Sequence, residues 1–209
     1  MEKILVVGAT GTTGHKIVEL LKSSELFEPI AMVRNEAQES EFKTKNIKTV
    51  FGDLEQDVSK TVTGADKVIF AAGSGGKKVE AVDRDGAIKM IKASEDANIK
   101  KFVMLSSMGA DKPEQSERLQ DYLTAKQKAD QYLTSSHLNY TIVRPGRLNN
   151  HPGQGHIQLG KSLSNSGEIS RDDVAKTLVY ALDNEQSNTS TFEILEGDTA
   201  IPEAFKSMS

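Results

Sequence analysis

KILVVGATGTTG, residues 3–14, is the stretch that decides the fold of this 209-residue chain. Residues 3–7 are rich in β-branched and apolar side chains and predict a short buried strand that ends at Gly8. An amphipathic pattern follows and predicts a helix over 12–22. A strand, a glycine-rich turn and a helix N-terminus together form a pocket that can hold a pyrophosphate group. The sequence therefore predicts dinucleotide binding, rather than a purely structural turn, at the start of the chain.

The three glycines of this turn have separate expected roles. Gly8 permits the tight turn, Gly11 lets the backbone approach the phosphates, and Gly14 lets the helix lie close to the sheet. The N–H groups and positive dipole end of the helix then supply the anion site. The cofactor contacts predicted here are Gly8, Thr10, Gly11, Thr12, Thr13 and Gly14. Because Ala9 stands where a GxGxxG fingerprint needs glycine, the spacing is GxxGxxG.

The bulk composition limits the class of protein. The length is typical of one domain, and the absence of cysteine excludes disulfides, thiolate catalysis and zinc-thiolate sites. Acidic residues number 30 and basic residues 26, for a formal charge of −4, which argues against nucleic-acid or anionic-membrane partners. No apolar run is long enough for a membrane span and no signal peptide is evident. We therefore expect a cytoplasmic protein.

Short β-branched runs alternate with segments of helical periodicity along the chain. This alternation is typical of right-handed βαβ units and a parallel sheet. The predicted strands are 3–7, 29–33, 47–51, 67–71, 101–106, 140–144 and 191–195. The predicted helices are 12–22, 38–44, 57–62, 79–97, 115–135 and 171–182. We expect an α/β protein in which residues 1–209 form a single Rossmann-type three-layer domain with a mainly parallel twisted sheet.

The GATGxxG wording resembles the short-chain dehydrogenase/reductase superfamily, in its atypical and extended branches. The resemblance covers nearly the whole chain and is greatest to compact NAD(P)H-binding members related to biliverdin/flavin reductases and NmrA-like proteins. Members that act on nucleotide sugars carry an additional C-terminal substrate domain. Residues 145–209 are too few for such a domain, so we do not expect a sugar-nucleotide epimerase.

Arg34 indicates which cofactor is preferred. A free ribose 2′-OH is usually held by Asp or Glu about 20 residues past the glycines. Arg34 stands there instead, with no adjacent acid, and a guanidinium can bind a 2′-phosphate through paired hydrogen bonds. In the family that the chain resembles, a second strand that ends in an aliphatic residue followed by Val and Arg is likewise associated with NADP as the cofactor. We therefore expect NADP(H) to be preferred over NAD(H), and the other reading of Arg34 is an ordinary exposed strand-end residue.

Two further segments are expected to contact the cofactor, because the resemblance implies it. After the third strand the superfamily places an acid near the adenine, which corresponds to Asp53 followed by Leu54. After the fourth strand, small residues pass under the adenosine ribose. The contacts predicted in that second segment are Ala71, Ala72 and Gly73. Gly-Asp by itself is also an ordinary turn signal.

A serine-bearing strand end and a Tyr-x-x-x-Lys pair suggest reductase chemistry. Tyr122 and Lys126 share one helical face, and an ammonium beside a phenol favours the phenolate, which suits a general acid. Ser106 or Ser107 can hydrogen-bond the carbonyl oxygen that is reduced. The set resembles the superfamily's catalytic triad, in which Ser107 better matches the serine and Lys126 also holds the nicotinamide ribose. Lysine is frequent in this chain, so a Tyr-x-x-x-Lys pair can also arise by chance, but its location after a serine-bearing fifth strand favours the catalytic interpretation.

The segment 146–170 is the expected substrate side. Proline and glycine after Arg144 can turn the chain over the nicotinamide end, where Pro145 is a predicted contact. Ser170 is a predicted N-cap for the late helix. The four histidines show no metal-ligand spacing, so no metal site is expected. The asparagine that relays protons in many members has no evident counterpart after the fourth strand.

Two functions remain open from the sequence. The first is an NADPH-dependent oxidoreductase that reduces a small carbonyl, quinone or flavin-like acceptor, with Ser107, Tyr122 and Lys126 as catalytic residues. It implies a small-molecule substrate and a monomer or small homo-oligomer, with Ser106 and Lys126 also near the cofactor. The second is a non-catalytic NADP(H)-binding regulator that senses redox state and acts through a protein partner. Both bind the cofactor, and only the first consumes it.

Overall fold

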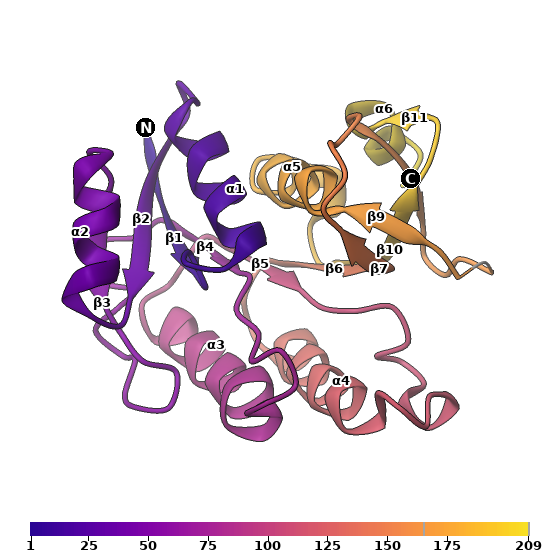
Figure 1. Ribbon diagram of the computed structural model, residues 1–209, viewed down its shortest axis with the longest axis horizontal. Coiled ribbons are helices and arrows are strands. Elements are labelled where there is room, and N and C mark those ends of the chain that lie inside the picture. The colour runs from indigo at the N-terminus through magenta and orange to yellow at the C-terminus, as the bar shows by residue number, and fades with distance from the viewer. Residues whose placement is uncertain (165, 209) are drawn as a thin grey trace.

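Strands and helices alternate along the computed structural model, which describes residues 1–164 and 166–208 (Figure 1). The strands are β1 (Glu2–Val7), β2 (Phe27–Val33), β3 (Lys48–Phe51), β4 (Lys67–Phe70), β5 (Lys101–Leu105), β6 (Tyr140–Pro145), β7 (Arg147–Asn149), β8 (His156–Gly160), β9 (Glu168–Ser170), β10 (Ser190–Glu196) and β11 (Thr199–Ala200). The helices are α1 (Thr12–Lys22), α2 (Glu36–Thr44), α3 (Ala87–Asp96), α4 (Gln120–Ser135), α5 (Arg171–Ala181) and α6 (Ile201–Lys206). A π-helical segment, Val79–Gly86, leads into α3, and single 3₁₀ turns span Pro113–Gln115 and Glu185–Ser187.

The main sheet has a Rossmann-type strand order. Among the described residues it contains nine strands in the order β11-β8-β10-β6-β5-β4-β1-β2-β3. Every neighbouring pair from β10 to β3 is parallel, and β8 and β11 add an antiparallel edge. The chain therefore moves outward from β1 first through β2 to β3 and then, in the other direction, through β4. Ligands bind such sheets beyond the carboxyl ends of the strands at this reversal.

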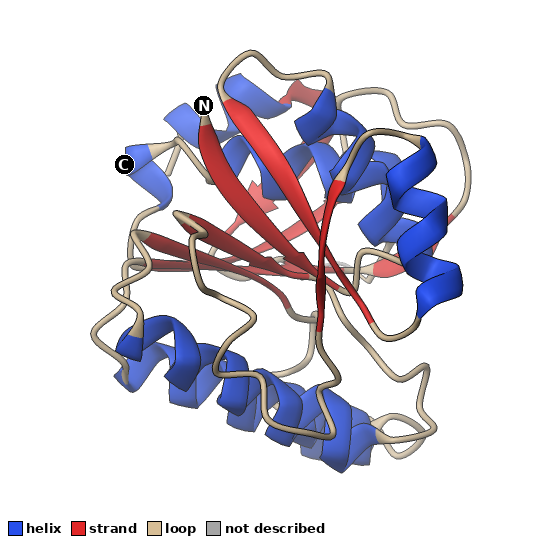
Figure 2. Ribbon diagram, turned by 90° about the vertical axis from the view of Figure 1, so that its left-hand side faces the viewer, coloured by secondary structure: helices blue, strands red, loops and turns tan. Residues whose placement is uncertain are grey.

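Helices cover both faces of the sheet, as Figure 2 shows. Alternate residues of β1 belong to different cores: Ile4 packs with α1, α5 and α6, while Leu5 packs with α3 and α4. Both side chains are fully buried, because a parallel strand in the middle of the sheet is covered on both faces. The predicted α/β class, three layers and mainly parallel sheet are confirmed.

The helix predicted over 57–62 is wrong. The segment forms turns instead, because side chains satisfy its backbone locally. The carboxylate of Asp57 accepts hydrogen bonds from the N–H and hydroxyl of Ser59, both at 2.9 Å. Thr61 donates its hydroxyl proton to the Val58 carbonyl at 2.7 Å. The apolar side chains that suggested a helix still face the core, since Val58 is 2% exposed.

Two other predicted helices differ from the structure in their first residues. The one predicted over 115–135 begins only at Gln120, after the 3₁₀ turn at Pro113–Gln115. The one predicted over 79–97 starts as the π-helical segment and becomes α-helical at Ala87. Single π turns inside helices are frequent at functional sites.

The substrate-side segment contains strands that the sequence did not predict. β7 and β9 form a small parallel sheet of their own, and β8 pairs with β10 and β11. Two carboxylates at the start of α5 fasten the loop between β7 and β8. Asp172 accepts the N–H of Gly153 at 3.0 Å, and Asp173 accepts those of Gln154 and Gly155 at 2.9 and 2.7 Å. The predicted N-cap is present, because the Ser170 hydroxyl accepts the N–H of Asp173.

Candidate functional site

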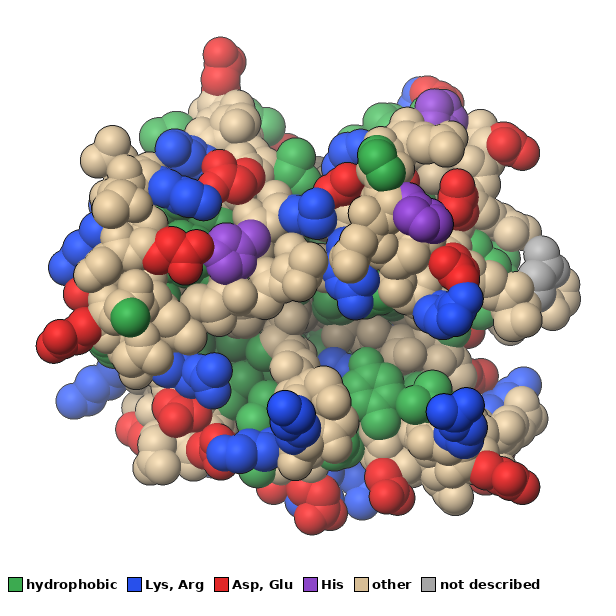
Figure 3. Space-filling view, viewed as in Figure 1, with side chains coloured by type: hydrophobic (Ala, Val, Ile, Leu, Met, Phe, Trp, Pro, Cys, Tyr) green, Lys and Arg blue, Asp and Glu red, His purple; other side chains and the backbone are tan. Residues whose placement is uncertain are grey.

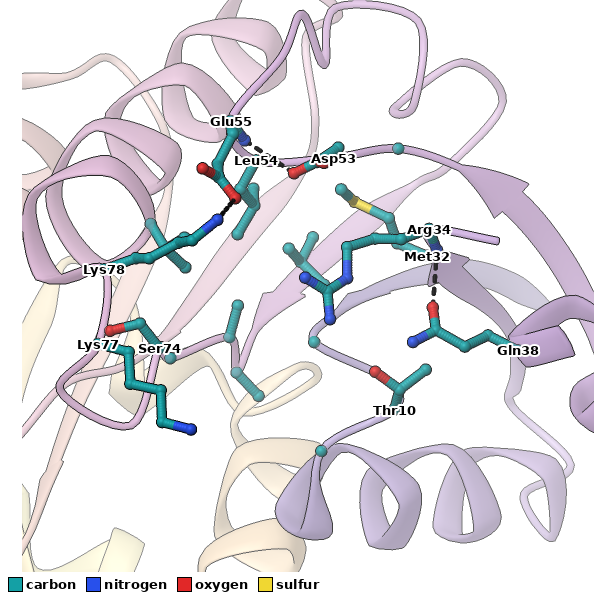
Figure 4. Close-up of a pocket in the computed structure, with 18 residues that line it drawn as sticks. Thr10, Met32, Arg34, Gln38, Asp53, Leu54, Glu55, Ser74, Lys77 and Lys78 are labelled. Carbon is teal, nitrogen blue, oxygen red and sulfur yellow. Dashed lines mark hydrogen bonds and ion pairs between the residues drawn. The ribbon is translucent and has the colours of Figure 1, made fainter. Parts of the chain in front are cut away.

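A cleft of about 480 Å³ opens at the carboxyl ends of β1, β2, β3 and β4 (Figure 4). In the space-filling view a hollow crosses the same face, between the part with α1 and α5 and the part with α3 and α4 (Figure 3). The predicted cofactor residues that line the cleft are Gly8, Thr10, Gly11, Arg34, Asp53, Leu54, Ala71, Ala72 and Gly73. The cleft therefore brings together the ends of four strands that are far apart in the sequence.

The glycine-rich turn provides a cradle that side chains would fill. Gly8 has a φ of +87°, and a Cβ there would lie 2.6 Å from Cα of Ala72 in the loop after β4. A Cβ on Gly14 would collide with the carbonyl oxygen of Gly8. A Cβ on Gly11 would meet only that same oxygen, at 3.3 Å, and Gly11 lines the cleft. The cradle has the shape and exposed backbone needed for a pyrophosphate group.

Arg34 follows β2 directly, and its side chain extends into the cleft (Figure 4). Its backbone N–H donates to Gln38 Oε1 at 2.8 Å, and Asn35 caps α2 by accepting the N–H of Gln38 at 3.0 Å. Within the part of the chain that the structure describes, the Arg34 guanidinium has no hydrogen bond or ion pair. Its charge is therefore available to an anion in the cleft.

The loops after β3 and β4 close the other side of the cleft. Asp53 accepts the N–H of Glu55 at 3.0 Å, and Lys78 Nζ binds Glu55 Oε1 at 2.6 Å. The lining residues that the sequence did not predict are Val7, Met32, Gln38, Gly52, Glu55, Ser74, Lys77, Lys78 and Val82. The rule that ligands bind beyond strand ends could have extended the prediction to the residues after Leu54 and Gly73.

The remaining predicted cofactor residues do not line the cleft. Thr12, Thr13 and Gly14 form the first turn of α1, where Thr13 and Gly14 are buried. Pro145 is the last residue of β6. Ser106 and Lys126 are buried between the strand ends and α4.

Tyr122 and Lys126 are brought together on one face of α4. The ammonium of Lys126 lies 5.7 Å from the centre of the Tyr122 ring, as expected for residues one helical turn apart. It also donates a hydrogen bond to the carbonyl oxygen of Leu105, at 3.3 Å. The i,i+4 spacing thus puts the two side chains side by side, and Lys126 joins them to the end of β5.

The two serines after β5 point into different surroundings. Ser106 is buried and donates its hydroxyl proton to Asp130 Oδ2 at 2.9 Å. The same oxygen accepts hydrogen bonds from the guanidinium of Arg144, at 3.0 and 2.9 Å. Burial raises the pKa of Asp130, while Arg144 and Ser106 act in the opposite direction. The Ser106 hydroxyl is therefore occupied, whereas Ser107 is half-buried and, among the described residues, its hydroxyl donates only to the adjacent Met108 carbonyl, at 3.2 Å.

Asp83 is a residue of this region that the sequence analysis missed. It lies in the π-helical segment, is fully buried, and its Oδ2 accepts the N–H and hydroxyl of Ser74 at 3.1 and 2.6 Å. Its Oδ1 has no hydrogen-bond partner among the described residues and lies 3.7 Å from Lys126 Nζ. Asp83 could have been found from the sequence as an acidic residue on the apolar face of a predicted helix, because a buried charge requires a partner.

Two further features are absent from the described residues. None of their helices is both long and apolar enough to cross a membrane. No three or more of their His, Cys, Asp and Glu side chains form a group that could hold a metal ion.

Comparison with known proteins agrees with this geometry. A protein family described as NAD(P)H-binding matches residues 8–185. The "Uncharacterized sugar epimerase YhfK" of Bacillus subtilis is 40% identical over 99% of this chain and 100% of its own length. An NAD(P)H azoreductase of Xenophilus azovorans is 32% identical over 68% of this chain and 47% of its own length.

A solved structure has nearly the same backbone. The putative NAD-dependent epimerase/dehydratase of Bacillus halodurans superposes with a TM-score of 0.94 at 39% identity. The match covers 99% of this chain and 100% of that one. The fold described above, with its strand order and helical layers, is therefore shared with this solved structure.

Proposed function

The protein belongs to the NAD(P)H-binding family, and on that premise we propose that it is an NADPH-dependent oxidoreductase for a small carbonyl, quinone or flavin-like acceptor. The observation that carries the proposal is the cleft, in which a glycine cradle and the unpaired Arg34 guanidinium face the same space. A relative named as an NAD(P)H azoreductase supports the reductase class.

In this proposal the chain holds NADPH along the carboxyl ends of its strands. The backbone around Gly11 and the start of α1 bind the pyrophosphate, and Arg34 binds the 2′-phosphate. Asp53 and Leu54 contact the adenine, and Ala71, Ala72 and Gly73 pass under its ribose. When bound, the cofactor supplies a hydride to the acceptor.

The proton comes from the chain. Tyr122 donates its phenolic proton to the acceptor oxygen that gains negative charge, and solvent returns a proton to the phenolate. Ser107 donates a hydrogen bond to the same oxygen, because its hydroxyl has only a weak local partner. Lys126 holds the nicotinamide ribose and stays beside the Tyr122 ring. Segment 146–170, fastened by Asp172 and Asp173, forms the substrate side.

A second function is favoured by one specific observation. Lys126 is buried and already bonded to the Leu105 carbonyl, with Asp83 beside it. A lysine held in this way suits a non-catalytic NADP(H)-binding regulator that reports redox state to a partner protein. Two relatives are named as epimerases. In contrast to a reductase, an epimerase returns its cofactor unchanged.

The experiment that tests the proposal has two steps. Calorimetry with NADPH and NADH measures binding, and a panel assay then follows NADPH oxidation with quinones, flavins and aldehydes. We expect tight NADPH binding and turnover of at least one acceptor class. Binding without turnover of any acceptor supports the regulator, and no binding of either cofactor rejects both functions.

A further inference from the structure

Gln38 lies beside Arg34 at the cleft and has no role in the functions considered so far. It belongs to the first turn of α2 and lines the cleft together with Thr10 and Arg34. Its backbone is fixed, because its N–H donates to the capping side chain of Asn35 at 3.0 Å. Its position relative to β2 is therefore set by the start of the helix.

The amide of Gln38 has a defined orientation. Its Oε1 accepts the backbone N–H of Arg34 at 2.8 Å, so the nitrogen Nε2 must occupy the other position. In Figure 4 this nitrogen is turned toward the side of the cleft where Arg34 and Thr10 lie. Among the described residues Nε2 has no acceptor, so both of its N–H groups are available to a ligand.

Among the described residues, no carboxylate is hydrogen-bonded or ion-paired with the Arg34 guanidinium or the Gln38 amide. The acidic residues that line the cleft are Asp53 and Glu55, and both are engaged with other groups. Asp53 accepts the N–H of Glu55, and Glu55 is paired with Lys78 at 2.6 Å. A guanidinium and an amide that line one cleft, with no carboxylate bonded to either, are complementary to a dianionic phosphate monoester.

We infer that Gln38 is a second determinant of cofactor selectivity, which donates Nε2–H to the 2′-phosphate that Arg34 also binds. The inference rests on the proposed NADPH function and adds a residue to it. Through Oε1, Gln38 also holds the backbone at the point where the Arg34 side chain begins. The selectivity therefore depends on the amide itself and not only on a positive charge.

The decisive variant is Gln38→Glu, with Gln131→Glu as the matched control. A glutamate keeps an oxygen that can accept the Arg34 N–H, so the local fold is retained. Its other oxygen repels the 2′-phosphate and competes for the Arg34 guanidinium. Gln131 undergoes the same chemical change on an exposed face of α4, far along that helix from Tyr122. Dissociation constants for NADPH and NADH are measured by calorimetry for both variants and the wild type.

We expect Gln38→Glu to weaken NADPH binding about 10- to 150-fold, the range for a lost charge-assisted hydrogen bond, and to leave NADH within a few-fold. Gln131→Glu should leave both constants unchanged. A variant that keeps the wild-type ratio of the two constants overturns the inference. If Gln38→Glu does not fold, Gln38→Met provides the test, because it removes the same Nε2–H donor without adding a charge, with an expected NADPH-specific loss in the same range of about 10- to 150-fold. A wild type that binds neither cofactor rejects the proposed function instead.

Discussion

The ammonium of Lys126 lies 3.7 Å from Asp83 Oδ1, and the two side chains are 3% and 0% exposed. The pair joins two parts of the site, since Asp83 also binds Ser74 in the cleft wall and Lys126 lies beside Tyr122. Taking both charges out of water is costly, and each is tolerated only because the other is present. The pair is therefore sensitive to the loss of either partner.

Replacing Asp83 by Asn should destabilise the protein strongly. The change keeps the shape and removes the carboxylate that pairs with the buried Lys126 ammonium, and breaking a buried pair in this way typically costs about 3–5 kcal/mol. Urea unfolding of Asp83→Asn, Lys126→Met and the double variant measures the effect. We expect the double variant to be less destabilised than the sum of the single ones, by about 0.5–3 kcal/mol.

Glu80→Gln is the control for this cycle. Glu80 lies in the same π-helical segment and pairs with Arg84, but its side chain is 79% exposed. The change should alter the free energy of unfolding by no more than about 0.5 kcal/mol. Strict additivity of the two buried substitutions contradicts a direct interaction between Asp83 and Lys126.

Gly11→Val should abolish NADPH binding while the protein still folds. Gly11 has a φ of −79°, which valine can adopt, and a Cβ there would meet only the Gly8 oxygen at 3.3 Å. The added side chain instead fills the space that the cofactor phosphates need. Calorimetry measures the binding, and thermal unfolding measures the stability.

Gly14→Ala provides the contrast, because its Cβ collides with the Gly8 carbonyl inside the protein. We expect this second variant to lose stability whether or not cofactor is present. If Gly11→Val retains wild-type affinity for NADPH, the glycine-rich turn is not the phosphate site.

The sequence could predict the parts of the fold that local patterns encode. β1, the turn and α1 follow from a buried run, a glycine that needs positive φ and a helical period, all within residues 3–22. The six other strands of the parallel part of the sheet, β2 to β6 and β10, were recognised in the same way. β7, β8 and β9 were not, because they are short and partly polar and form only when a distant strand pairs with them.

The candidate site also contains residues that the sequence predicted and residues that it missed. Arg34 was predicted from its distance past the glycines, and Asp53 because the resemblance to a known family implies it. Asp83 was missed, because its partners Ser74 and Lys126 are brought to it by folding and not by spacing. The helix wrongly predicted at 57–62 failed for a local reason, since the Asp57 carboxylate forms a turn that periodicity does not detect.

Acidification should loosen the substrate-side loop through Asp172. A hydrogen bond from Lys16, and then one from the Gly153 N–H, lowers the pKa of this carboxyl below its ordinary value of 3.8. A lowered folded-state pKa contributes stability above the unfolded value, and that contribution is lost as the pH falls through the folded-state pKa.

Urea unfolding of the wild type and Asp172→Asn, at pH 7 and at pH 3 and below, measures this contribution. We expect the wild type to be the more stable at pH 7 and the difference to shrink as the solution is acidified. A difference that is constant over this range contradicts the role of the Asp172 charge in holding Gly153.

Tyr122→Phe should reduce turnover without changing cofactor affinity. The variant keeps the ring beside Lys126 and removes only the phenolic proton, and general acid catalysis typically contributes about 10²–10⁴-fold. Steady-state assays with the best acceptor of the panel, together with calorimetry for NADPH, separate the two effects. Tyr132→Phe, a half-buried tyrosine further along α4, is the matched control and should retain wild-type turnover. Wild-type turnover by Tyr122→Phe contradicts Tyr122 as the proton donor, because the acceptor must then take its proton from water or from a group near Ser107.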